Sequence, residues 1–182
     1  MEARMRCGGR GSVAWGTAVS RAVAAVLALA VAWSPQAFGG VLTSGEVSPS
    51  EGEDWTTSPY GDAQVGWSDW GEVTISNGSE AYTGDTFIGG DAYDVGSGRI
   101  HLTGSSASWR CYEAIIGYSG SGEVEVDSGA AMSVTTQVTI GNFTDAVGTL
   151  RVTDFGSGLD DVNRIDVGSQ GNGTLEILDG AS

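Results

Sequence analysis

The sequence predicts an all-β fold made of stacked coils, a solenoid, and two observations carry that prediction. A phrase occurs five times: a β-branched residue and glycine, a short polar gap, a second glycine, then alternating apolar residues. The copies start 23, 28, 24 and 27 residues apart, a spacing typical of repeat proteins whose coils stack on one another. The alternation has a period of two residues, which indicates strands and not an amphipathic helix. The five starts are Val65, Ile88, Ile116, Ile140 and Val167.

Residues 1–39 have the profile of a signal peptide. Four arginines precede the apolar run 22–33, and a helix break follows the run at Ser34-Pro35. Small residues at Ala37 and Gly39 predict cleavage after Gly39. The alternative is a membrane anchor, but the run is shorter than the roughly 20 residues that a spanning helix needs. We therefore expect an exported protein.

Residues 40–61 are polar and irregular, and we interpret them as a linker or an N-terminal cap. A solenoid needs a cap because its first coil otherwise presents unpaired backbone donors and acceptors. The aromatic rings of this region are expected to pack against the first coil, although carbohydrate binding is an alternative role for them. They are Trp55, Tyr60, Trp67 and Trp70.

Residues 62–182 are predicted to form the coils, each with two short strands. In the Gly-x-Val-x-Ile strand the apolar side chains should point inward, and the polar residues between them should face water. The second strand leads into the next Ile-Gly, and the glycines form the corners between strands. The predicted inward residues are Val73, Ile75, Val124, Val126, Leu150, Val152, Leu175 and Ile177.

Residues 178–182 match the middle of an earlier repeat, so we expect the coils to continue in a longer array. About three or more coils must stack to be stable, and the five predicted here satisfy that requirement. A sandwich built from the same short strands is the main structural alternative.

The charge of the chain restricts its partners. The formal net charge is −15, no lysine occurs, and four of the eight arginines lie in the predicted leader. Binding to nucleic acid or to an anionic membrane is therefore not expected, whereas glycans, basic surfaces and divalent cations remain as partners. Cys111 is the only cysteine after the leader, which excludes an internal disulfide and favours an ordinary small core residue over a reactive thiol.

The leader together with the Ile-Gly-x-Gly-x-Gly-x-Val-x-Val phrases resembles the passenger repeats of bacterial autotransporters and related exported repeat proteins. The resemblance covers residues 65–182 and implies a right-handed parallel β-solenoid of about five coils. It also implies a protein that is extracellular or displayed on the surface of a Gram-negative-type bacterium, where it acts in adhesion or as a stalk. Partners would be glycans, host or cell-surface components, or further repeats. We expect contact with a membrane only through an anchor that this sequence does not contain.

Parallel β-helices also carry polysaccharide lyases and glycoside hydrolases, so a carbohydrate-active enzyme is the alternative function. Hydrolysis needs two carboxylates roughly 5 to 9.5 Å apart. The richest acidic cluster lies beside Arg151 and Arg164, and turn formation beside glycine explains it without catalysis. We therefore expect no catalytic residues. The cluster consists of Asp154, Asp160, Asp161 and Asp166.

Metal ligands are sparse in this sequence. His101, the sole histidine, lies on the outward side of a strand by alternation, where we expect no role and no zinc site. Asp85, Asp91 and Asp94 surround Gly89–Gly90, where carboxylates and carbonyls could bind a structural Ca²⁺ ion. The Gly-Gly-x-Gly-x-Asp calcium repeat is missing, so solvated loop residues are the favoured interpretation and no cofactor is expected.

Overall fold

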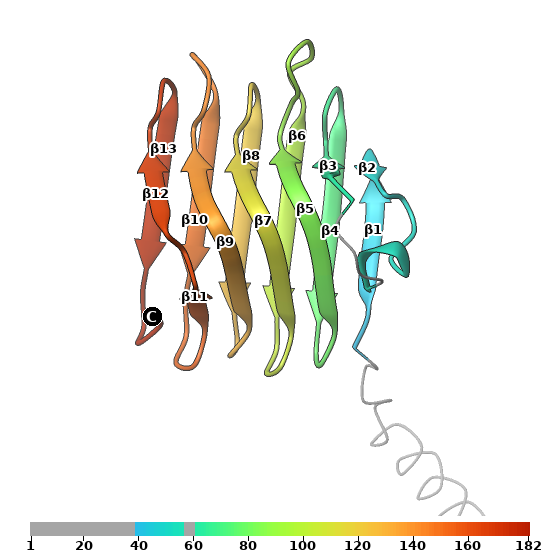
Figure 1. The fold of residues 1–182 in the computed structure, drawn as a ribbon, viewed down its shortest axis with the longest axis vertical. Helices are drawn as coiled ribbons and strands as arrows, with labels where there is room; N and C mark the ends of the chain where they lie inside the picture. The colour runs from blue at the N-terminus through green and yellow to red at the C-terminus, as the bar shows by residue number, and fades with distance from the viewer. Residues whose placement is uncertain (1–38, 57–60) are drawn as a thin grey trace, which may run out of the picture. The chain divides into compact units, whose positions relative to one another are not determined.

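The computed structural model describes residues 39–56 and 61–182, which form an all-β β-solenoid of about four turns (Figure 1). They belong to one compact unit, 38–182. The predicted signal peptide and Tyr60 lie outside the described residues, apart from Gly39. Within the described ranges the one helix is η1 (Asp54–Thr56), a single 3₁₀ turn. None of these residues forms a helix long and apolar enough to cross a membrane.

Two sheets stand face to face, and each coil contributes a strand to both. The first sheet, in spatial order, consists of β1 (Val41–Gly45), β4 (Trp70–Ser76), β6 (Ser97–Thr103), β8 (Ser121–Asp127), β10 (Val147–Val152) and β13 (Asn172–Ile177). The second consists of β2 (Val47–Ser48), β3 (Ala63–Val65), β5 (Glu80–Ile88), β7 (Ser108–Ile116), β9 (Ala131–Ile140) and β11 (Gly158–Asp160), with β12 (Arg164–Val167) also paired to β9. Neighbouring coils pair in parallel, which excludes the antiparallel sandwich.

The repeat phrase stacks in register through the whole first sheet. One inward column runs through Val73, Ile100, Val124, Leu150 and Leu175. The next runs through Ile75, Leu102, Val126, Val152 and Ile177. Up to β10 every one of these side chains is 0% exposed, which confirms the predicted inward face in those coils.

The two glycines of each repeat are required for different reasons. The first occupies a corner with positive φ, for example +70° at Gly117, where a side chain would strain the backbone. The second has no room for a side chain. A Cβ atom on Gly122 would lie 2.1 Å from the backbone nitrogen of Gly117 and 2.6 Å from the carbonyl oxygen of Ile88. Close packing between the corner and the neighbouring coil therefore selects glycine at this position.

The N-terminal end of the stack is covered by residues 40–56. Strand β1 pairs antiparallel with β4, and β2 pairs antiparallel with β3, so the chain reverses direction across the first coil. Trp55 is fully buried there, as expected, and its Nε1 donates a hydrogen bond to the carbonyl oxygen of Pro49 at 2.9 Å. Trp70, in contrast, is 46% exposed, so it covers the coil only in part.

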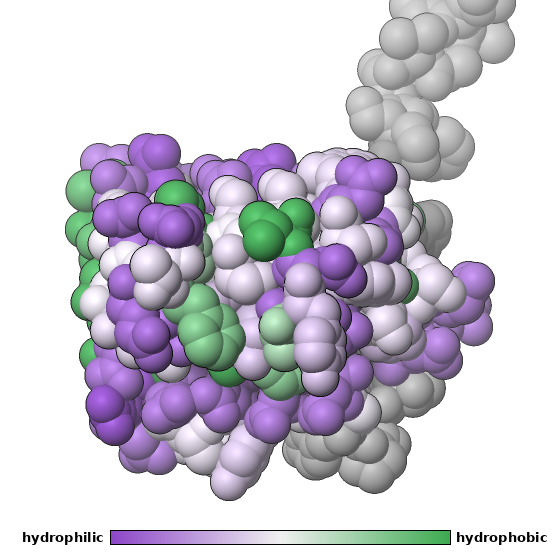
Figure 2. Space-filling model, turned by 90° about the horizontal axis from the view of Figure 1, so that it is seen from above, coloured by the Kyte–Doolittle hydropathy of each residue, from purple (hydrophilic) through white to green (hydrophobic). Residues whose placement is uncertain are grey.

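The opposite end of the described stack is open. Four coils, from β4–β5 to β10 with β11 and β12, contribute strands to both sheets, while β3 adds a strand to the second sheet alone and β13 to the first alone, so about four turns replace the expected five. Ile177 is 47% exposed and Leu175 is only partly buried, because no further strand covers β13. Both residues continue the predicted inward columns, and the end of the stack leaves them partly exposed. Apolar residues lie along this end of the surface, where β12 and β13 are located (Figure 2, left edge).

Candidate functional site

The three aspartates considered for calcium are not brought together. Asp85 lies on the outer face of β5, whereas Asp91 and Asp94 belong to the loop that follows it. The Oδ1 atom of Asp91 accepts hydrogen bonds from the backbone nitrogens of Tyr93, at 2.7 Å, and Asp94, at 2.8 Å. This carboxylate therefore stabilises its own loop. The strand alternation directs Asp85 to the sheet face, where its neighbours come from other coils.

Turns account for two of the four aspartates in the acidic cluster near the C-terminus. Asp154 and Asp161 have positive φ values of +75° and +57°. Each accepts a hydrogen bond from a serine of the preceding coil, at 3.2 Å and 3.0 Å respectively. Asp166 lies on β12 and pairs with Arg164 at 2.7 Å, while Asp160 ends β11. The interpretation as turn residues therefore holds for Asp154 and Asp161, whereas Asp160 and Asp166 lie on strands.

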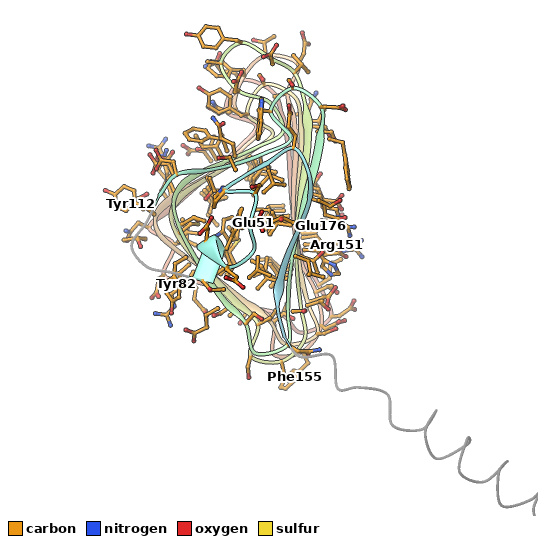
Figure 3. All side chains as sticks on the ribbon, turned by 90° about the vertical axis from the view of Figure 1, so that its right-hand side faces the viewer. Glu51, Tyr82, Tyr112, Arg151, Phe155 and Glu176 are labelled. Atoms are coloured by element: carbon orange, nitrogen blue, oxygen red, sulfur yellow. The ribbon has the colours of Figure 1, made fainter. Side chains whose placement is uncertain are left out.

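A groove of about 780 Å³ lies on the outer face of the second sheet, where its strands bend. The bend coincides with a register shift between Cys111 and Glu113, which gives β9 one more residue than β7. Tyr112 projects outward at this position, on the side of the molecule opposite Arg151 and Glu176 (Figure 3). Lining groups include Asp62, Asp85, Arg110, Tyr112, Ser133 and Asp161. The groove therefore combines carboxylates, a guanidinium and an aromatic ring.

Three carboxylates follow one another across this face. Asp85 pairs in register with Glu113, and Asp62 comes directly before β3, one coil earlier. Burial raises the pKa of Asp85, and the charges of Asp62 and Glu113 raise it further. Glu113 also accepts a hydrogen bond from the amide of Gln137 at 2.5 Å. A carboxyl group with a raised pKa beside other carboxylates is an arrangement that acid catalysis can use.

Cys111 lies beneath the groove and is 2% exposed. Burial raises the pKa of its thiol well above the ordinary value, and the carboxylates of Asp85 and Glu113 add to that effect. Its thiolate is therefore disfavoured, as is nucleophilic chemistry. The prediction of a small buried core residue is confirmed.

The outer face of the first sheet carries a network of charges. Arg99 lies 3.2 Å from Glu72, 3.7 Å from Glu123 and 2.7 Å from Glu125. Burial opposes the charge of Arg99, but these carboxylates outweigh it and raise the pKa of the guanidinium. His101 faces outward as predicted, and its Nε2 atom lies 2.8 Å from Oδ2 of Asp127. These partners are 24 to 27 residues apart in the chain, so the spacing between successive coils is the sequence signal that could have revealed them.

Comparison of the chain with known protein families, with characterised proteins and with solved structures finds no match to any of them.

Proposed function

We propose that this chain is an exported structural or adhesive repeat protein of the bacterial cell surface or extracellular space, without catalytic activity. The observation that carries the proposal is the unbroken register of the first sheet, where glycines and apolar residues stack in the same columns and the apolar residues are buried up to β10. Such a stack holds its outer faces rigidly over a length set by the number of coils. Long regular faces of this kind suit a stalk or an adhesive surface.

The open end of the stack is a second support. The apolar side chains of β12 and β13 are partly exposed, and only one edge of each strand is paired. Backbone atoms of Ser182 pair with Ser157 and Leu159, which places this residue where a further strand of the second sheet would begin. Apolar columns and free strand edges are the surface that another coil of the same repeat would cover.

Export is tested by fusing residues 1–39 to a reporter enzyme that lacks its own leader and is active only outside the cytoplasm. Reporter activity is expected in a Gram-negative host, and it should disappear when charged residues replace part of the apolar run 22–33. Reporter retained in the cytoplasm with residues 1–39 intact would contradict export.

Adhesion is tested by incubating the purified chain with immobilised glycans and with intact host and bacterial cells. Saturable retention without product formation supports the proposal. Release of reducing ends or unsaturated sugars from acidic or neutral polysaccharides would contradict it.

The groove on the second sheet favours a second candidate, a carbohydrate-active enzyme. Its carboxylates come from neighbouring coils, which are spaced about 5 Å apart in a sheet, near the separation that retaining hydrolysis requires. Asp85, with its raised pKa, would be the proton donor. Turnover that is lost in Asp85→Asn and retained in Asp91→Asn would establish this candidate. Loss on Asp160→Ala or Asp161→Ala would assign the activity to the C-terminal acidic cluster instead.

A further inference from the structure

The register of the first sheet brings an imidazole and two carboxylates together on its outer face. His101 on β6 pairs directly with Glu125 on β8, and Asp127 follows two residues later on the same side of that strand. One ligand atom from each of the three side chains lies within 4.8 Å of the others. In the part of the chain that the structure describes, this is the one such group of three. It includes none of the three aspartates that the sequence suggested for calcium.

The surroundings of these side chains hold them in place. The hydroxyl of Thr103 donates a hydrogen bond to Oδ1 of Asp127 at 2.6 Å, which leaves Oδ2 facing His101. Arg99 donates to Oε2 of Glu125 at 2.7 Å, so the other oxygen of Glu125 is not engaged by that bond. Hydrogen bonds of this kind orient the ligands of metal sites and raise metal affinity.

Burial and charge also favour a cation here. The side chains of His101, Glu125 and Asp127 are 24%, 22% and 18% exposed, so water is partly excluded while one direction stays open. The face also carries Glu72 and Glu123 against the single charge of Arg99, which leaves it net negative.

The donor atoms indicate which cations fit. Calcium takes six to eight oxygen ligands, and this group offers a ring nitrogen and too few oxygens for it. Zinc and similar divalent ions accept nitrogen and carboxylate oxygen together, with three protein ligands and a water in an open fourth position. The metal would replace the hydrogen that now joins His101 to Asp127, because both atoms of that bond are ligand atoms. Both strands are paired on their two sides, so little reorganisation is needed.

We propose that His101, Glu125 and Asp127 form a binding site for a divalent transition-metal ion of the zinc class on the outer face of the first sheet. The site does not depend on the proposed function, because its geometry comes from the register of the solenoid alone.

The test is a titration of the purified full chain with Zn²⁺, followed by isothermal calorimetry and by NMR of the imidazole. His101 is the only histidine, so its ring signals report on this site alone. We expect one high-affinity ion per chain and a shift of the His101 signals that saturates at the same ratio. The variants His101→Gln, Glu125→Gln and Asp127→Asn should each weaken binding by about tenfold or more.

Glu123→Gln is the matched control. Glu123 lies on the same strand and the same face as Glu125, also borders Arg99, and loses the same charge on substitution. Its affinity for Zn²⁺ should stay within about twofold of the unchanged chain, since charge alone contributes little at an exposed site. Equal weakening by Glu123→Gln and Glu125→Gln would overturn the site in favour of diffuse attraction to acids. Zn²⁺ binding that leaves the His101 signals in place would overturn it as well. Circular dichroism of each variant separates loss of binding from loss of folding.

Discussion

The stacking of the coils predicts different costs for two leucines that occupy the same column. Leu150 on β10 lies between Val124 and Leu175, and it is 0% exposed. Leu150→Ala removes a fully enclosed side chain, so both the lost burial and the remaining cavity contribute, about 3–5 kcal/mol in total. Leu175 on β13 has a neighbouring coil on one side only. Leu175→Ala should therefore cost less, about 1–2.5 kcal/mol, since the stack encloses this side chain only in part.

The assay is urea unfolding of the full chain, followed by far-ultraviolet circular dichroism and by tryptophan fluorescence. With a slope of about 2 kcal/mol per M, Leu150→Ala should lower the midpoint by about 1.5–2.5 M, and Leu175→Ala by about half as much. Equal shifts for the two variants would refute the reasoning, because they would mean that the outer side of β13 is covered. Repeating the series at several protein concentrations identifies whether a second copy of the chain provides that cover.

Three further predictions test individual contacts by the same unfolding assay. Gly122→Ala should lower the free energy of unfolding by about 3 kcal/mol or more, because the new Cβ atom would overlap backbone atoms that cannot move independently. The control is Gly61→Ala, where a Cβ atom has no neighbour within 4 Å and stability should change by less than about 0.5 kcal/mol. Asp85→Asn should raise the midpoint at neutral pH, because burial and neighbouring carboxylates raise the pKa of Asp85 above 3.8 and its charge destabilises the fold. That gain should vanish below pH 3.8, and a gain that persists there would contradict the assignment. Asp127→Asn should destabilise the fold at neutral pH, because hydrogen bonds hold the pKa of Asp127 in the folded chain below 3.8. This loss of stability should shrink as the pH falls through the pKa of the folded state. A loss independent of pH would show that the carboxylate charge is not involved.

Much of the coil could be predicted from local patterns. Val124 and Val126 were assigned to the interior because alternation separates inward from outward residues without knowledge of the partner strand. The glycine at Gly117 was assigned to a corner for a similar reason, and its φ of +70° agrees. Alternation also places Ile177 in an inward column, but it specifies only a direction, and Ile177 is 47% exposed because burial also requires a neighbouring coil on its other side.

The candidate sites could not be predicted in the same way. Asp85, Asp91 and Asp94 are close in sequence, but the strand directs the first to the sheet face and the loop turns the second back onto its own backbone. His101 and Asp127 are 26 residues apart and yet in hydrogen-bond contact. The register between neighbouring coils decides which side chains meet. Insertion of one residue in a corner shifts this register but leaves the strand pattern unchanged, so the proximity of the two side chains depends on the length of each corner.

The sequence by itself therefore determined the class of fold, the repeating unit and the direction of the apolar side chains, because period-2 alternation and glycine corners are local properties of the chain. Tertiary structure alone decided which coils stand next to one another in register and where the second sheet bends into a groove. These features arise from pairing between strands more than 20 residues apart, and no local pattern encodes the partner.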